Sequence, residues 1–230
     1  MSENRKFSVL MSVYVKENPV FLEEAVESII HQTLKPSEVV IVEDGPLTPE
    51  LYQVLEKLEA QSSIPIKRCP LEQNRGLGLA LQYGVLQCQY DVIARMDTDD
   101  IAVEDRFEQQ FELMEKENLD LLGGHIAEFI DQPDEIVSYR RVPIKHEDIV
   151  AYQRMRSAFN HMTVMFKRKM VLKAGNYEDG LYMEDDLLWL NMISAGARTG
   201  NVDQILCKVR VGAGMFERRG GLRYLKLYRQ

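Results

Sequence analysis

The stretch DVIARMDTDD, residues 91–100, decides the fold because it joins a short apolar segment directly to a group of carboxylates. The apolar residues predict a buried strand over 91–96, and Asp97, Asp99 and Asp100 follow where that strand ends. Carboxylates this close repel one another, and burying them is costly unless they are paired or bind a metal. The sequence therefore predicts a site at the end of this strand.

Strands and helices are predicted to alternate on both sides of this stretch. The expected strands span residues 7–14, 39–42, 64–68 and 91–96, and the expected helices span 19–32, 48–60, 76–87 and 103–117. Such alternation is typical of an α/β fold, in which helices cover both faces of a mostly parallel sheet. Ligands bind such sheets at the carboxyl ends of the strands, where both Glu43-Asp44 and the acidic group at 97–100 are expected.

The second half of the chain has a less regular order of predicted elements. Strands are expected over residues 119–130, 136–142 and 163–167, and helices over 169–173 and 185–195. No internal repeat, low-complexity tract or linker separates independent domains. We therefore expect one domain over residues 1–215, followed by a basic segment over 216–230.

Composition and charge exclude several classes of protein. The chain has 45% hydrophobic residues and a net charge of −8, which disfavours a general nucleic-acid binder. Its three cysteines form no CxxC pair, which indicates neither a disulfide framework nor a zinc site and favours the reducing cytosol. No apolar run is long enough for a transmembrane helix, and the apolar residues near the start predict a buried strand rather than a signal peptide.

The last residues, RRGGLRYLKLYRQ (218–230), contain five Arg or Lys residues and no acidic one. Leucine and tyrosine side chains alternate with these charges, so the segment is amphipathic. Two interpretations stay open. The segment contacts an anionic membrane surface, or it forms a solvated C-terminal helix.

Three aspartates after a buried strand suit the binding of a hard divalent cation. Mg²⁺ and Mn²⁺ prefer carboxylate oxygens and are usually held by one or two carboxylates together with substrate phosphates. The alternative is that Asp99 or Asp100 caps a helix that begins near Ile101, which explains one aspartate but not three. EF-hand, Walker and dinucleotide-binding patterns are all incomplete in this sequence.

A second acidic cluster lies in YMEDDLLWLN, residues 182–191. Glu184, Asp185 and Asp186 open a predicted helix, where negative charge is favoured by the free N–H groups and the helix dipole. The same position suits a general base that faces a metal site, and the two interpretations are compatible. His161, in FNHMTVMFKR, precedes a predicted strand, and a histidine in such a place is more often packed or solvated than catalytic.

Taken in order, these segments resemble the family-2 glycosyltransferases, which are inverting enzymes with the GT-A fold that use nucleotide sugars. The matching segments are FSVLMSVYVKENPVFLEEAVESIIHQTLKPSEVVIVEDG (7–45), NRGLGLALQYGV (74–85), MDTDD (96–100), HMTVMFKR (161–168) with GNY (175–177), and MEDDLLWL (183–190). The resemblance runs from residue 7 to about residue 211. It implies a Rossmann-like, mostly parallel central sheet flanked by helices, with a nucleotide-sugar half over 1–102 and a smaller acceptor-side region over 103–215.

The resemblance also implies roles for individual residues. The implied nucleotide-binding residues are Ser12, Val13, Tyr14, Glu17, Asp44, Arg75, Gly76, Asp97 and Thr98. The implied ligands of Mn²⁺ or Mg²⁺ are Asp97, Asp99, Asp100 and His161. The implied catalytic base is Asp185 or its neighbour Glu184.

The implied activity is metal-dependent, inverting transfer of a hexosyl or N-acetylhexosaminyl group from a nucleotide diphosphate donor, with a UDP-sugar favoured. The implied acceptor is a hydroxyl of a glycan or lipid-linked saccharide in surface-polysaccharide synthesis. Such an enzyme would lie in the cytoplasm or at the inner face of the cell membrane. Two alternatives stay open: a non-catalytic nucleotide- or carbohydrate-binding protein, and a haloacid-dehalogenase-like phosphotransferase, whose DxD nucleophile motif MDTDD resembles.

Overall fold

The computed structural model describes residues 5–179 and 183–212. The strands are β1 (Ser8–Val13), β2 (Glu38–Glu43), β3 (Ile66–Pro70), β4 (Val92–Arg95), β5 (Ile101–Ala102), β6 (Leu121–Phe129), β7 (Ile136–Arg140), β8 (Met165–Lys167) and β9 (Thr199–Arg210). The helices are α1 (Pro19–Ile30), α2 (Pro49–Gln61), α3 (Leu77–Gln87), α4 (Arg106–Glu117), α5 (His146–Gln153), the 3₁₀ helix η1 (His161–Thr163), α6 (Arg168–Lys173) and α7 (Glu184–Ser194).

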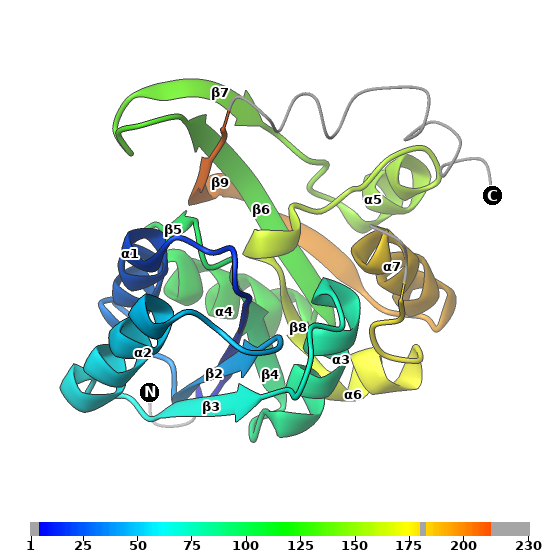
Figure 1. Ribbon diagram of the computed structural model, residues 1–230. Helices are drawn as coiled ribbons and strands as arrows, with labels where there is room; N and C mark the ends of the chain where they lie inside the picture. The colour runs from blue at the N-terminus through cyan, green and yellow to red at the C-terminus, as the bar shows by residue number, and fades with distance from the viewer. Residues whose placement is uncertain (1–4, 180–182, 213–230) are drawn as a thin grey trace, which may run out of the picture.

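One nine-stranded sheet runs through both halves of the chain, in the order β3-β2-β1-β4-β8-β6-β9-β5 with β7 beside β6 (Figure 1). The four strands β3, β2, β1 and β4 are parallel to one another, and the antiparallel pairs all involve strands of the second half. The chain leaves β1 toward β2 on one side and later returns to its other side with β4. The carboxyl ends of these strands therefore meet at a topological switch point, where ligands bind in open α/β sheets.

Helices cover both faces of the sheet because the strands of its parallel part are apolar on both sides. Alternate residues of a strand point to opposite faces, and in β1 Met11 packs into the core beneath α1, α2 and α4. Its neighbour Leu10 packs on the other face with side chains of α3, α5, α6 and α7. Figure 1 shows α3, α6 and α7 on the same side of the sheet.

The first two predicted helices, expected over 19–32 and 48–60, begin at Pro19 and Pro49. Asn18 precedes α1 and its side chain accepts a hydrogen bond from the backbone N–H of Val20, at 2.9 Å. Thr48 precedes α2 and accepts from the N–H of Leu51, at 3.3 Å. Each helix has proline at its first position, where the missing N–H costs nothing.

The prediction was wrong in the stretch after the three aspartates. The expected helix over 103–117 begins only at Arg106, and Ile101–Ala102 form β5, which pairs antiparallel with β9. Neither Asp99 nor Asp100 therefore caps a helix. Strand β9 and helix α5 were not predicted at all.

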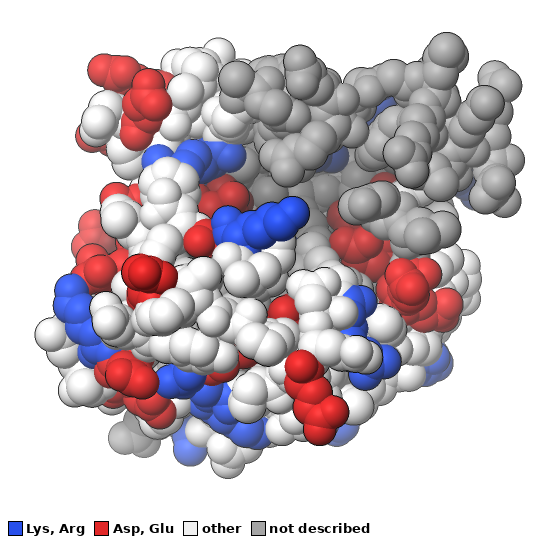
Figure 2. All heavy atoms as spheres, viewed as in Figure 1, with Lys and Arg blue, Asp and Glu red and all other residues white. Residues whose placement is uncertain are grey.

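The charge on the surface is mixed rather than strongly basic. On the face seen in Figure 2, Lys and Arg side chains lie among Asp and Glu side chains over α1, α2 and β3, and acidic side chains gather near α7. The three cysteines are buried and unpaired. Within residues 5–179 and 183–212, no helix is both long and apolar enough to cross a membrane. The basic segment 216–230 lies outside the described residues.

Candidate active site

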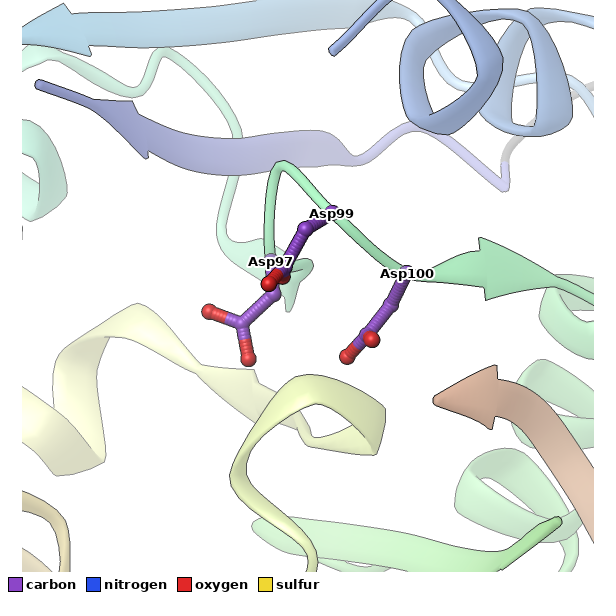
Figure 3. A group of neighbouring side chains, drawn as sticks. All are labelled: Asp97, Asp99 and Asp100. Carbon is purple, nitrogen blue, oxygen red and sulfur yellow. The ribbon is translucent and has the colours of Figure 1, made fainter. Parts of the chain in front are cut away.

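The loop between β4 and β5 brings three carboxylates together. Asp97, Asp99 and Asp100 each offer an oxygen, and these atoms lie within 4.8 Å of one another. Figure 3 shows the three side chains on this one loop, with their carboxylates directed to the same side of it. The sequence expectation that these aspartates form one group at the end of a strand is met by this geometry.

Fixed contacts hold this loop in place. Asp97 forms an ion pair with the guanidinium of Arg95, a side chain that is 2% exposed. Asp100 Oδ1 accepts a hydrogen bond from the backbone N–H of Arg210 at the end of β9, at 3.0 Å. The hydroxyl of Thr98 donates to the carbonyl oxygen of Ser12 in β1, at 3.4 Å. The acidic loop is thereby attached to three strands of the sheet.

The negative charges of the carboxylates in this loop are not fully balanced by the neighbouring cations and N–H groups of the protein. Burial, and then the neighbouring charge of Asp97, raises the pKa of Asp99 to about 6. The same two causes, together with the charge of Asp99, raise the pKa of Asp100 well above its usual range. Burial and then Asp99 and Asp97 raise the pKa of Glu17 to about 7. A divalent cation relieves such repulsion, and an all-oxygen donor set suits Mg²⁺ or Mn²⁺.

Arg95 is a residue of this acidic site that the sequence analysis missed. It lies inside β4, and its Nε and Nη1 atoms are buried without a hydrogen-bond partner among the described residues. Arg106 in α4 donates from Nη2 to the Arg95 carbonyl oxygen, at 2.7 Å, and so fixes the backbone at this point. A lone arginine inside an apolar strand was the available signal, because a buried cation requires a nearby anion.

A second acidic position lies at the carboxyl end of β2. The buried carboxylate of Asp44 accepts hydrogen bonds from Asn74 Nδ2 at 3.0 Å, from the N–H of Arg75 at 2.7 Å and from the N–H of Gly76 at 3.0 Å. The loop around residue 74 approaches so closely that a Cβ on Gly45 would lie 2.5 Å from the Asn74 nitrogen. The structure therefore brings the predicted residues Asp44, Arg75 and Gly76 together.

The first strand contributes residues between these two acidic positions. Ser12 is half-buried and the side chain of Val13 is fully buried, so Val13 can offer only its backbone to a ligand. The side chain of Tyr14 is 37% exposed at the end of β1. Glu17 follows in a turn whose N–H donates to the Tyr14 carbonyl oxygen, at 3.1 Å.

The predicted base lies in the first turn of α7. The side chain of Asp185 is 22% exposed, and its Oδ1 accepts a hydrogen bond from the N–H of Asp186, at 2.9 Å. Burial, followed by the charges of Asp186 and Glu184, raises the pKa of Asp185 to about 7. A carboxyl group with this pKa can accept a proton near neutral pH.

His161 lies beside this base and is not one of the three grouped metal-ligand candidates. Its Nδ1 is 4.0 Å from Asp185 Oδ2, and its Nε2 is 2.9 Å from the hydroxyl of Tyr177. Burial, and then the charge of Arg95, lowers the pKa of His161 well below its usual value, so the ring is neutral. Tyr177 lies in the matching segment GNY (175–177), but the sequence analysis assigns it no role.

A surface cavity of about 810 Å³ lies away from these residues, between α4, the start of α5 and β9. Its lining includes Gln109, His146 and Asp203 but none of the residues predicted from the sequence to act in a site. The chemistry-bearing side chains therefore gather at the switch point and not in this cavity.

The fold and site together are those of an α/β enzyme with its acidic groups at the switch point of the sheet. The family model described as "Glycosyl transferase family 2" matches residues 8–175, and the chain belongs to this family. The protein is a glycosyltransferase, and this membership favours that interpretation over the phosphotransferase and the non-catalytic binding protein.

Several curated proteins are similar along almost the whole chain. An uncharacterized glycosyltransferase of Haemophilus influenzae is 46% identical over 222 residues, which are 96% of this chain and 82% of the relative. The amylovoran biosynthesis glycosyltransferase AmsE of Erwinia amylovora is 42% identical, over 96% of this chain and 82% of its own. An Escherichia coli protein named UDP-Gal:alpha-D-GlcNAc-diphosphoundecaprenol beta-1,3-galactosyltransferase is 38% identical, over 95% of this chain and 79% of its own.

Solved structures confirm the expected GT-A fold. TarS of S. aureus superposes with a TM-score of 0.72 at 18% identity, over 93% of this chain but only 38% of the longer TarS chain. The mannosyltransferase PcManGT from Pyrobaculum calidifontis, in complex with GDP-Man and Mn²⁺, superposes with a TM-score of 0.70 at 15% identity. That match covers 92% of this chain and 59% of PcManGT.

Proposed function

We propose that this glycosyltransferase moves a sugar from a nucleotide diphosphate donor, with a UDP-sugar favoured, to a hydroxyl of a glycan or lipid-linked saccharide, and inverts the anomeric configuration. One observation carries the proposal: a carboxyl group with a pKa raised to about 7 and a group of three carboxylates suited to a cation interact with the same buried Arg95. Inverting transfer needs these two functions together, a base for the acceptor and stabilisation for the leaving diphosphate.

The nucleotide would bind along the ends of β1, β2 and β4. Ser12 and Val13 would offer backbone groups, and the exposed ring of Tyr14 would contact the base. Asp44 would orient Arg75 and Gly76 beside the base and ribose through the hydrogen bonds it already accepts. Glu17, Thr98 and Asp97 would contact the nucleotide next to these groups, and the interaction of Glu17 with both of the other two supports this placement.

The three grouped carboxylates fit the divalent cation that the family resemblance implies. Asp97, Asp99 and Asp100 would hold Mn²⁺ or Mg²⁺, and their mutual repulsion is the observation that supports this fit. When bound, the ion supplies Lewis-acid stabilisation of negative charge on the leaving diphosphate. The neighbouring Arg95 keeps the carboxylate of Asp97 oriented.

Asp185 would accept the proton of the acceptor hydroxyl as that oxygen attacks the anomeric carbon. The ionised carboxylate is the active form, and its pKa of about 7 makes it a stronger base than an ordinary aspartate. A single displacement of this kind inverts the configuration. Glu184, in the same turn of α7, is the alternative base.

The acceptor half would comprise residues 103–215, and the names of two relatives guide its substrate. One relative is named for amylovoran biosynthesis and another for transfer from UDP-Gal to a GlcNAc-diphosphoundecaprenol. A lipid-linked acceptor in polysaccharide synthesis is therefore the first choice for this chain. Such an acceptor would place the enzyme at the cytoplasmic face of a membrane, where the basic segment 216–230 would contact anionic lipid.

The first test is calorimetric titration of the full chain with UDP, in Mn²⁺ and then in EDTA, with GDP as the control nucleotide. We expect binding of UDP that depends on the metal, followed by transfer from UDP-galactose to a lipid-diphosphate-linked GlcNAc acceptor. Metal-dependent binding of GDP alone would change the donor and keep the reaction. If neither nucleotide binds, the proposal fails.

A further inference from the structure

His161 links the proposed base to a buried tyrosine. Its two ring nitrogens face different groups: Nε2 lies 2.9 Å from the Tyr177 hydroxyl, and Nδ1 lies 4.0 Å from Asp185 Oδ2. Tyr177 is fully buried, and the side chain of His161 is 10% exposed. The ring is therefore held between a hydroxyl on one side and a carboxylate on the other.

The position of the ring proton follows from what each neighbour can donate. In a neutral imidazole one nitrogen donates a hydrogen bond and the other accepts. Within residues 5–179 and 183–212, the Tyr177 hydroxyl has no hydrogen-bonding partner other than His161 Nε2. If Nε2 carried the proton, the tyrosine proton would lack an acceptor, and the lone pair of Nδ1 would face the carboxylate of Asp185.

The opposite arrangement satisfies both neighbours. The Tyr177 hydroxyl donates to Nε2, and the N–H on Nδ1 then points its positive end toward Asp185 Oδ2. Burial raises the pKa of Tyr177 and lowers that of His161, which agrees with a protonated phenol beside a neutral ring. This is the less common tautomer of free histidine, so the site must actively select it.

We propose that Tyr177 and His161 are positioning residues for the proton-transfer step: the Tyr177 hydroxyl keeps the imidazole proton on Nδ1, and this N–H orients the ionised carboxylate of Asp185. The inference rests on the proposed function. The distance of 4.0 Å is longer than a hydrogen bond, and such contacts shorten when the substrates bind. Asp185 Oδ1 already accepts the N–H of Asp186, so a contact to Oδ2 fixes the rotation of the whole carboxylate.

His161 could alternatively act in packing or as a metal ligand, and each of these roles requires a different geometry of the ring. As a packing residue it would act only through its ring, which lies 5.6 Å from that of Tyr177 and 5.8 Å from that of Trp189 between centroids. As a metal ligand it would need an unprotonated nitrogen directed at the carboxylates of Asp97 and its neighbours. In the structure Nε2 is instead directed at Tyr177.

The tautomer can be measured without turnover. We would record the ring nitrogens of the four histidines in the full chain, labelled with ¹⁵N-histidine, by two-dimensional NMR, and assign His161 from its loss in His161→Gln. We expect the proton on Nδ1 in the wild type and a shift toward Nε2 in Tyr177→Phe. Protonation of Nε2 in the wild type would overturn the inference, and so would a ¹⁵N shift on adding Mg²⁺ that shows direct coordination.

Kinetics then separate positioning from packing. Tyr177→Phe keeps the aromatic ring and should lower kcat about tenfold, with the donor KM and UDP affinity unchanged. Tyr52→Phe is the matched control: its hydroxyl accepts the N–H of Leu47, and its ring packs on the opposite face of the sheet from Tyr177. His161→Asn, whose amide can donate near the place of Nδ1, should retain more activity than His161→Ala.

The decisive comparison uses the base itself. In an Asp185→Asn background, Tyr177→Phe should cause no further loss, because the two residues act on one step. An equal loss in both backgrounds, or a wild-type-like kcat in Tyr177→Phe, would show that the tyrosine does not act through Asp185. Absence of transfer by the wild type would instead refute the proposed function, while the NMR result would still decide the tautomer.

Discussion

Asp44 and the group formed by Asp97, Asp99 and Asp100 occupy equivalent places at the ends of parallel strands, but the protein treats them differently. The carboxylate of Asp44 accepts three N–H groups from residues 74–76. Among the described residues, the three grouped aspartates have the buried Arg95 as an ion-pair partner and the N–H groups of Arg210 and of Asp99 itself as backbone donors, and burial raises the pKa of two of them. The protein itself completes one acidic position, and we propose that a cation completes the other.

Asp185 resembles the three grouped aspartates rather than Asp44. One of its oxygens accepts a backbone N–H, while its acidic neighbours and burial raise its pKa to about 7. We infer that hydrogen-bond saturation separates the carboxylate that organises the loop around residue 74 from the carboxylates proposed to act in metal binding and proton transfer. Substitutions at the saturated position should therefore affect folding, and substitutions at the crowded positions should affect chemistry.

The largest effect is expected from Asp185→Asn. An amide cannot accept the acceptor proton, so transfer should fall about 10²- to 10⁴-fold, while affinity for UDP stays within about twofold. Single-turnover assays and calorimetry would measure the two quantities. Glu184→Gln is the matched control from the same turn of α7, and a larger loss in that variant would move the base to Glu184.

A smaller effect, and one that depends on the metal, is expected from Asp99→Ala. Loss of a cation ligand should weaken UDP binding in Mn²⁺ by at least about tenfold. Residues that only orient metal ligands already change metal affinity by this factor when they are substituted. In EDTA the variant and the wild type should bind equally. Asp131→Ala, at an exposed position in the turn between β6 and β7, controls for a general loss of negative charge. Equal weakening in both buffers would remove Asp99 from the proposed ligand set.

Much of the first half of the fold could be predicted because its signals are local. Strands β1 and β2 follow from continuous apolar runs, and helix α1 follows from the spacing of its apolar residues along one face. Strand β9 could not be predicted in this way. Its residues Asp203 and Gln204 are exposed, its pairing with β6 shifts register, and that partner lies more than 70 residues earlier in the chain.

The site shows the same limit. The sequence placed Asp97, Asp99 and Asp185 correctly at element ends, because strand ends and helix starts can be recognised locally. The partners of these residues could not be predicted, since they depend on tertiary packing. The hydrogen bond of His161 to Tyr177 spans a strand, a helix and a turn, and no spacing rule connects the two residues.

The third prediction concerns Asp44, whose carboxylate already accepts three N–H groups. Asp44→Asn replaces an accepting oxygen with an amide that faces the N–H of Arg75 or Gly76, so one donor loses its partner. We expect the free energy of unfolding to fall by about 1–3 kcal/mol, measured by urea denaturation in EDTA. Asp131→Asn should leave it unchanged. A stability equal to the wild type, combined with lost UDP binding, would move Asp44 to the reactive kind.

The smallest expected effect is a gain in stability, whereas the preceding substitutions are expected to cause losses. The folded-state pKa of Asp99, about 6, lies above its unfolded value, so between these values the folded protein binds more protons than the unfolded one. This contribution to stability is present at low pH and is lost as pH rises through about 6. Asp99→Asn removes the repulsive charge, so in EDTA at pH 8 it should stabilise the protein by about 1 kcal/mol, and at pH 4 by almost nothing. Thermal denaturation at both pH values would measure the difference, expected to be roughly 2–4 °C at pH 8. A lower melting temperature than the wild type at pH 8 would mean that Asp99 is already satisfied by the protein, like Asp44, and the distinction between the two acidic positions would fail.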